Sequence, residues 1–236
     1  EGDEVREASG DLFGELVAGP RVGSLGELRL LAPVAPSKVL AIGLNYAAHA
    51  AEAGLKLPEM PIVFMKPPSA IVGPDEPIVL PNTDDKIEYE AELTVVIGKR
   101  CRNVKAGEEA GVILGYTCGN DVSNRVVQFG RSGQWVEGKA FDTFCPLGPC
   151  IATGLDSTKL AIRARLNGKT VQDSNTSDLG FDVAALVRHV SSVMTLEPGD
   201  VIMTGTPAGV GPMKPGDTIE IDIEGIGVLR NPVVSA

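Results

Sequence analysis

The chain is poor in aromatic residues, in histidine and in clustered positive charge. Phe, Tyr and Trp together make up 4% of its 236 residues, and there are only two histidines. Lysine and arginine number 21 against 31 acidic residues, which gives a formal net charge of −10. A protein that binds nucleic acid or an anionic membrane through its charge carries an excess of basic residues. We therefore expect neither partner.

Long apolar runs and cysteine motifs are also missing. No apolar run in the sequence approaches the roughly 20 residues that a membrane-spanning helix requires. The cysteines, Cys101, Cys118, Cys145 and Cys150, are scattered, with no C-x-x-C pair and no histidine at zinc-binding spacing. This usage is typical of reduced thiols, so we expect no zinc site and a soluble, cytoplasmic protein. The sequence begins with Glu1 rather than Met, and a preceding targeting segment is not excluded.

Glycine and proline, by contrast, are abundant, with 28 and 17 residues. They separate short runs rich in Val and Ile, a pattern typical of strands joined by turns. The runs cover residues 39–43, 62–65, 77–80, 87–97, 112–118, 160–166, 200–204 and 217–223. This pattern predicts a mainly β (α+β) fold with few helices.

Helical periodicity is confined to two segments. Residues 183–194 repeat apolar side chains at helical spacing after a candidate N-cap at Asp182, and Ala-rich residues 46–53 end at Gly54. The polar, Gly-rich residues 1–36 are predicted to form a small β-rich N-terminal segment, followed by the main domain at 37–236.

Three glutamates at alternate positions, Glu88, Glu90 and Glu92, lie in an otherwise apolar strand. Side chains two residues apart on a strand point to the same face. Half-buried carboxylates aimed at one place repel one another, and a bound divalent cation offsets that cost. The alternative is a strand whose polar face contacts water.

His49 and Glu52 are three residues apart in the segment N-Y-A-A-H-A-A-E, so on a helix they share one face. A carboxylate beside an imidazole orients the ring and raises its basicity, as a general base for water requires. The alternative is an incidental pair on a solvent-facing helix. The other histidine, His189, has no acidic residue three or four positions away and is expected to be a structural or surface residue.

Asp121 stands at the end of the apolar run 113–121, where an aspartate is usually a cap or a turn former. With Glu90 and Glu92 it could instead supply three carboxylates to a hard cation such as Mg²⁺ or Mn²⁺. Arg125, Gln128 and Lys139 follow it, and such groups near a metal suit an anionic, keto-acid-like substrate.

The Gly-rich segment 205–211 contains neither of the two nucleotide-binding motifs, G-K-[ST] and G-x-G-x-x-G. It is expected either to offer backbone N–H groups to a carboxylate or to be a tight turn between strands.

Taken in order, these segments resemble the fumarylacetoacetate hydrolase family. The motifs are N-Y-x-x-H-x-x-E, P-x-x-F-x-K-P, Y-E-A-E-L-x-V-V-I-G, G-Y-x-x-x-N-D-V-S-x-R-x-x-Q, G-K-x-F-D-x-F-x-P-L-G-P and L-x-P-G-D-V-I-x-T-G-T-P-x-G-V-G. The resemblance runs from about residue 38 to the C-terminus. It implies a twisted, mostly β roll or barrel, usually a homodimer, with a central Mg²⁺ or Mn²⁺ site. The larger N-terminal domain of the two-domain fumarylacetoacetases is absent, so the chain looks like the small bacterial members.

The resemblance also implies roles for individual residues. Glu90, Glu92 and Asp121 match the metal ligands, whereas Glu88 does not. The residues that match catalytic or substrate-binding positions are His49 and Glu52 (a water-activating pair on a mobile lid), Lys139 (the lysine beside the metal), and Arg125, Gln128, Gly205 and Thr206 (substrate contacts).

We therefore expect an enzyme acting on a small 2-oxo or 2,4-dioxo carboxylic acid, with the metal chelating its carboxylate and 2-oxo oxygen. Because both His49 and Glu52 are present, C–C bond hydrolysis of an acylpyruvate-type substrate through a metal-stabilised enolate is the first expectation. Oxaloacetate decarboxylation and isomerisation of 2-hydroxyhepta-2,4-diene-1,7-dioate are the alternatives. A metal-binding scaffold without catalytic activity would not need a water-activating pair.

Overall fold

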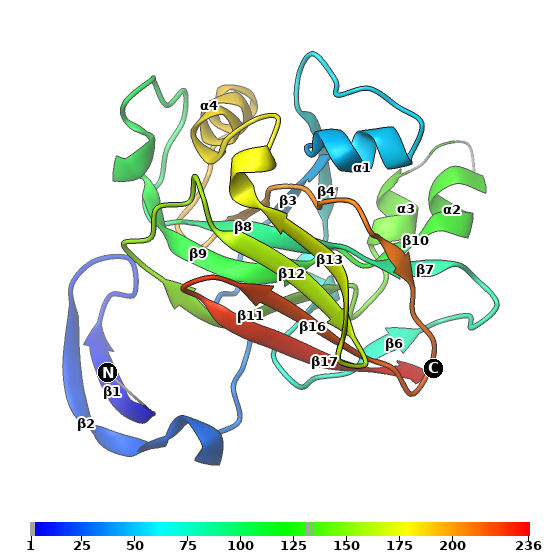
Figure 1. Ribbon diagram of the computed structural model, residues 1–236. Helices are drawn as coiled ribbons and strands as arrows, with labels where there is room; N and C mark the ends of the chain where they lie inside the picture. Colours follow the sequence, from blue (N-terminus) through cyan, green and yellow to red (C-terminus); the bar gives the residue numbers. More distant parts are fainter. Residues whose placement is uncertain (1–2, 131–132, 134) are drawn as a thin grey trace.

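A computed structural model describes residues 3–130, 133 and 135–236 of the chain. In these residues it contains seventeen strands, four α-helices and four short 3-10 helices (Figure 1). The predicted mainly β fold is confirmed. No helix within the described ranges is long and apolar enough to cross a membrane.

The centre of the molecule is a seven-stranded mixed sheet. Its strands, in spatial order, are β4 (Ile62–Lys66), β3 (Val39–Gly43), β14 (Val201–Met203), β8 (Ala91–Ile97), β9 (Ile113–Asn120), β11 (Cys145–Ala152) and β5 (Ile71–Val72). Both of its faces are covered. In β8, Leu93 and Val95 face one apolar cluster while Val96 faces the other, so every residue of this strand is buried.

A five-stranded sheet packs against one face of the central sheet. It consists of β13 (Lys169–Asn175), β12 (Ala161–Leu166), β16 (Thr218–Ile223), β17 (Gly227–Ser235) and β6 (Ile78–Leu80). Strands β12 and β16 contact β8, and β17 contacts β9 and β11. Strand β16 alternates: Ile219, Ile221 and Ile223 are buried between the sheets, and the residues between them are partly exposed.

Helix α4 (Val183–Val193) packs its apolar side, including Leu186, Val187 and Val190, against the same core. The predicted N-cap is confirmed, since the Asp182 side chain accepts a hydrogen bond of 2.7 Å from the Ala185 N–H. The other helices, α1 (Ala47–Glu52), α2 (Arg125–Gly130) and α3 (Trp135–Lys139), are each about one and a half turns long. They lie near one another at one end of the molecule (Figure 1).

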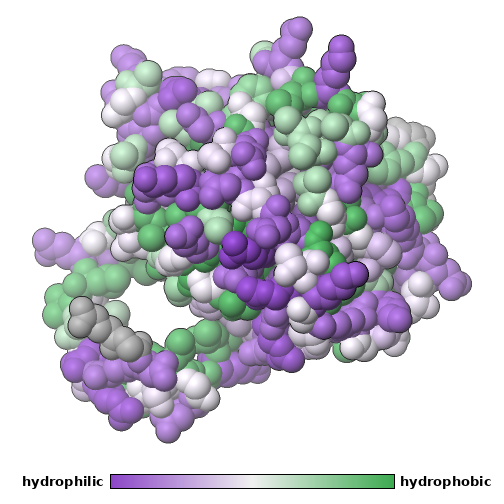
Figure 2. All heavy atoms as spheres, in the orientation of Figure 1, coloured by the Kyte–Doolittle hydropathy of each residue, from purple (hydrophilic) through white to green (hydrophobic). Residues whose placement is uncertain are grey.

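The remaining strands form two small sheets. A short sheet of β10 (Ser123–Asn124), β7 (Ile87–Tyr89) and β15 (Gly211–Pro212) lies near helices α2 and α3. At the N-terminus, β1 (Glu4–Gly10) and β2 (Leu16–Ser24) form an antiparallel hairpin, as predicted for a β-rich segment. Figure 2 shows this hairpin standing off the main body with an opening between them. The homodimer, the cytoplasmic location and the boundary at residue 36 stay predictions.

Candidate active site

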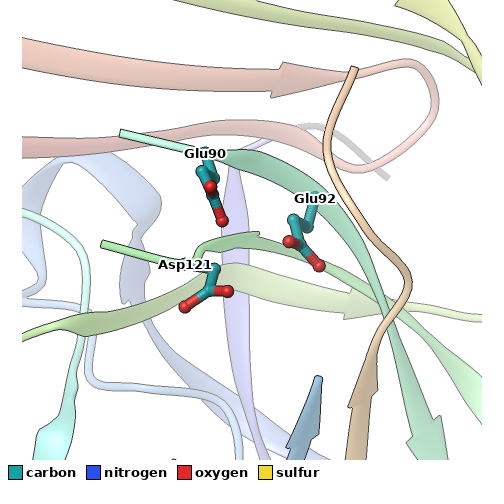
Figure 3. A group of neighbouring side chains, drawn as sticks. All are labelled: Glu90, Glu92 and Asp121. Atoms are coloured by element: carbon teal, nitrogen blue, oxygen red, sulfur yellow. The ribbon is translucent and has the colours of Figure 1, made fainter. Parts of the chain in front are cut away.

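Three carboxylates meet where the central sheet adjoins the short one. Glu90 separates β7 from β8, Glu92 lies in β8, and Asp121 directly follows β9. Strand pairing sets Ala91 opposite Asn120, and the Asp121 N–H donates to the Glu90 carbonyl oxygen at 2.9 Å. One carboxylate oxygen from each of the three residues lies within 4.8 Å of the others. Figure 3 shows the three side chains converging, so the structure brings together the residues that we predicted as metal ligands.

Two buried lysines contact this group. Lys139 Nζ, at the end of α3, lies 2.7 Å from Glu90 Oε2 and 2.6 Å from Asp121 Oδ2. Lys66 Nζ, at the end of β4, lies 2.6 Å from Asp121 Oδ1 and donates to the Val122 carbonyl at 3.1 Å. We assigned Lys66 no role from the sequence. The signal that could have identified it is a lysine directly after the apolar run 62–65, because a lysine buried at the end of a strand requires an acidic partner.

Arg125 links the carboxylate group to Glu88. Its Nε donates to Glu88 Oε2 at 2.7 Å, its Nη2 pairs with Glu90, and its Nη1 donates to Gln128 Oε1 at 2.8 Å. Glu88 Oε1 also pairs with Lys86 Nζ at 2.6 Å. Glu88 is therefore a buried partner that orients Arg125 rather than a member of the carboxylate trio.

The three carboxylates of the trio differ in their electrostatic environment. Burial, together with the charges of Asp121 and Glu90, raises the pKa of Glu92 well above its usual value. Burial also opposes ionisation of Glu90, but Arg125 and Lys139 outweigh it and hold that pKa well below its usual value. Glu92 has no cation in hydrogen-bond contact among the described residues and accepts a bond of 2.7 Å from the Gly205 N–H.

Acidic side chains outnumber the basic side chains buried with them at the site. Four buried carboxylates, at positions 88, 90, 92 and 121, face two buried lysines, at positions 66 and 139, and Arg125, whose side chain is 13% exposed. A divalent cation with a preference for oxygen ligands would reverse this imbalance. The donor set therefore fits Mg²⁺ or Mn²⁺, with Glu90, Glu92 and Asp121 as the residues that could hold it.

Helix α1 carries the predicted His49 and Glu52 pair. His49 Nδ1 lies 3.3 Å from Glu52 Oε2, and the His49 side chain is only 12% exposed. Both oxygens of Glu52 also accept the Gly209 N–H, at 3.1 and 3.2 Å. The Gly209 carbonyl in turn accepts the Tyr89 hydroxyl at 3.0 Å. The Gly-rich segment thus contacts a carboxylate through a backbone N–H group. This is one of the two arrangements that we expected for it.

Two side chains to which we assigned no role from the sequence, Asn45 and Gln172, fix the start of the Gly-rich segment 205–211. Asn45 donates to the Thr204 carbonyl at 2.8 Å, and a Cβ on Gly205, whose φ is +100°, would lie 2.7 Å from Asn45 Cβ. Gln172 Nε2 donates to Thr206 Oγ1 at 2.9 Å while its Oε1 accepts the Ala91 N–H at 3.0 Å. Their partners are more than 30 residues away in the chain, so no local pattern indicates them.

A cavity of about 370 Å³ connects these groups. Every residue to which we assigned a site role lines it except Gly205, which lies beside it as the donor to Glu92. A buried acidic trio, cationic partners and a histidine with a carboxylate thus surround one space of a size suited to a small molecule.

Residues 38–234 match the family model described as fumarylacetoacetate (FAA) hydrolase, C-terminal. The chain belongs to the fumarylacetoacetate hydrolase family. The resemblance inferred from the motifs is confirmed for almost all of the predicted main domain.

Several relatives in the fumarylacetoacetate hydrolase family carry the name of an enzyme. The mitochondrial oxaloacetate tautomerase of Xenopus laevis is 44% identical over 223 residues, which cover 89% of this chain and 70% of that protein. The crystal structure of 2-hydroxyhepta-2,4-diene-1,7-dioate isomerase from Mycobacterium marinum is 47% identical, with a TM-score of 0.91 and coverage of 98% and 88%. Maleylpyruvate hydrolase from Sphingobium sp. SYK-6, solved with manganese(II) and pyruvate, is 39% identical, with a TM-score of 0.80 and coverage of 92% and 77%.

Proposed function

We propose that this protein is a Mg²⁺- or Mn²⁺-dependent hydrolase that cleaves a C–C bond in a small acylpyruvate-type acid. The observation that carries the proposal is the His49 and Glu52 pair, which lines the same cavity as the acidic trio. Isomerisation and decarboxylation need no activated water, whereas hydrolysis does. The manganese(II) and pyruvate in the structure of the maleylpyruvate hydrolase support both the metal and the 2-oxo acid.

The substrate's 2-oxo acid end would lie beside the acidic trio. A divalent cation held by Glu90, Glu92 and Asp121 would act there as a Lewis acid and lower the cost of forming an enolate. Arg125 and Gln128, which are fixed to each other at 2.8 Å, would orient the substrate's carboxylate. Lys139 would deliver or accept a proton at C3 from its position between Glu90 and Asp121.

The water would be activated at the other side of the cavity. With Nδ1–H of His49 donating to Glu52, the second ring nitrogen accepts a proton from water. The resulting hydroxide adds to the C4 carbonyl, and on collapse the C3–C4 bond breaks. Its electron pair moves to C3 as the enolate of pyruvate, and one proton returns to C3. The products are pyruvate and the carboxylic acid of the acyl group, which balances the addition of one water.

Keto-enol tautomerisation of a 2-oxo acid such as oxaloacetate is the second candidate. The names of the tautomerase and isomerase relatives favour it, as these proteins are 44% and 47% identical to this chain. Such a reaction moves only protons, so Lys139 and a metal at the trio suffice for it and His49 is not required.

The experiment that separates the two reactions is a paired assay on wild type and His49→Ala. Release of pyruvate from acetylpyruvate is followed together with solvent deuterium exchange at C3, both with Mg²⁺ or Mn²⁺. We expect His49→Ala to lower kcat for cleavage by roughly 10²- to 10⁴-fold, the usual contribution of a general base, and to leave exchange within a few-fold. Unchanged cleavage would mean that the pair is structural, and equal loss of both would assign His49 to proton transfer at carbon.

A further inference from the structure

One wall of the cavity is a row of aromatic side chains that begins at the acidic trio. The Phe64 ring lies 5.0 Å from Lys139 Nζ, which itself contacts Glu90 and Asp121. Trp135 packs edge-on against Phe64, with ring centroids 5.8 Å apart, and Phe129 packs edge-on against Trp135 at 6.4 Å. Phe64 is buried, whereas Phe129 is 61% exposed. The row therefore leads from the charged centre towards solvent, and we call it the aromatic wall.

The backbone beside the aromatic wall is shaped to accommodate it. A Cβ on Gly43 would lie 2.6 Å from Trp135 Cζ3, so glycine at this position lets the indole ring approach the end of β3. Leu44, the next residue, lines the cavity and holds a left-handed conformation with φ of 54°. Strain of this kind persists only where the surrounding structure enforces it, and it clusters at ligand sites. Leu55 and Val210 add further apolar surface to the lining.

The lysine and arginine side chains that line the cavity already have acidic partners. The described cations that line the cavity are Lys86, Arg125 and Lys139, and each one contacts a carboxylate of Glu88, Glu90 or Asp121. The lining carries five acidic residues against these three cations, with Glu52 and Glu88 among the acids. Among these lining residues, a second carboxylate at the far end of a substrate would find no lysine or arginine that lacks an acidic partner.

We propose that the substrate's tail, the part beyond the 2-oxo acid group, is apolar and packs against Phe64, Trp135 and Phe129. This inference rests on the proposed function, because it places the 2-oxo acid group at the acidic trio. It selects acylpyruvates with an alkyl or aryl acyl group over those whose acyl group ends in a carboxylate. Contact with an aromatic surface stabilises an apolar tail, and one or two methylene groups there change specificity by about tenfold or more.

Two six-carbon acids of matched length test the tail alone. 2-Oxohexanoate ends in a methyl group and 2-oxoadipate ends in a carboxylate, and neither has the 4-oxo group that hydrolysis needs. Their dissociation constants, and that of pyruvate as the head group without a tail, are measured by calorimetry with Mn²⁺ present. We expect 2-oxohexanoate to bind about tenfold tighter than either 2-oxoadipate or pyruvate. Equal or tighter binding of 2-oxoadipate would overturn the inference.

Variants of the wall connect the preference to its residues. Trp135→Ala should weaken 2-oxohexanoate about tenfold and leave pyruvate unchanged. Phe129→Ala, at an exposed position that tolerates truncation, should weaken it less, and Phe129→Lys should shift the preference towards 2-oxoadipate by adding a cation at the mouth. Val136→Ala is the matched control, since Val136 lies on α3, is 50% exposed and does not line the cavity. Variants at 129 and 135 that behave like this control would overturn the inference.

Failure of the tail inference is distinguishable from failure of the proposed function. If pyruvate binds in a metal-dependent way and acetylpyruvate is cleaved, but 2-oxoadipate is preferred, only the tail inference falls. If pyruvate does not bind and no acylpyruvate is cleaved, the proposed function falls and the tail inference falls with it.

Discussion

Glu92 differs from Glu90 and Asp121 in what surrounds its carboxylate. Glu90 contacts Arg125 and Lys139, and Asp121 contacts Lys66 and Lys139. Burial, together with the negative charges of Asp121 and Glu90, raises the pKa of Glu92, and the hydrogen bond from the Gly205 N–H offsets this only in part. Removing the Glu92 charge therefore relieves repulsion. Removing the Asp121 charge takes from Lys66 the carboxylate that it contacts, and removing the Glu90 charge takes from Arg125 and Lys139 one of their two carboxylate partners each.

This difference leads to opposite effects on stability for similar substitutions. Glu92→Gln should leave the free energy of unfolding of the metal-free protein unchanged or raise it. Asp121→Asn should lower it by about 3–5 kcal/mol, and Glu90→Gln should lower it by less, because Arg125 keeps Glu88 and Lys139 keeps Asp121. All three should lose at least about 100-fold in Mg²⁺ or Mn²⁺ affinity, because each removes a charged oxygen ligand. Urea unfolding and calorimetry measure the two effects, with exposed Glu59→Gln as the control. Undiminished metal affinity in Glu92→Gln would remove Glu92 from the ligand set.

Site residues could be predicted from the sequence where their chemistry depends on close neighbours in the chain. Alternate carboxylates in an apolar strand and a histidine with a glutamate three residues later are visible in a short window, and the structure places these groups on one cavity. Lys66, Asn45 and Gln172 were missed as members of the site. Their contacts join β4 to Asp121, the end of β3 to Thr204, and β13 to Thr206, so they exist only after the strands have been brought together.

At the scale of elements, the apolar β segments were predicted well and the polar or interrupted ones were not. The run 87–97 was predicted as one strand, but it is two, β7 and β8, because the chain changes sheet at Glu90. Strand β11 was missed because its sequence, C-P-L-G-P-C-I-A, contains two prolines and a glycine, which locally favour turns. Pairing with β9 and β5 overrides that preference. Helices α2 and α3 are too short to show a helical repeat.

Helix α1 is connected to the Gly-rich segment through one carboxylate, and this contact predicts how the helix moves. Glu52→Ala removes the acceptor for the Gly209 N–H, so hydrogen exchange at that amide and across residues 47–54 should become about tenfold faster. Gly54, whose φ is +71° and whose surroundings are open, is the expected hinge. Exchange followed by mass spectrometry measures the effect, with Glu59→Ala as the control in the following loop. Unchanged exchange would show that packing of α1, and not this contact, holds the helix in place.

The whole molecule carries a formal charge of −10, and part of the excess is buried in the site. Four buried carboxylates against two buried lysines and the partly buried Arg125 give the folded state an unfavourable charge that the unfolded chain, dispersed in water, does not share. A divalent cation that binds only the folded state therefore stabilises the entire chain and not only the cavity. A ligand at 100 times its dissociation constant contributes about 2.7 kcal/mol.

Mn²⁺ or Mg²⁺ at that excess should raise the melting temperature by about 5–10 °C for a chain of this length. Lys66→Met should melt at a lower temperature without metal, because Asp121 loses one of its two buried ammonium partners. The same variant should gain more from the metal than wild type does, since the metal's charge substitutes for the one removed. Lys86→Met, whose partner Glu88 keeps Arg125, is the control and should behave as wild type. Scanning calorimetry of the three proteins, with chelator and with metal, measures all six cases. A smaller metal-induced rise in Lys66→Met than in wild type would show that Lys66 orients Asp121 for the metal rather than competing with the metal for its charge.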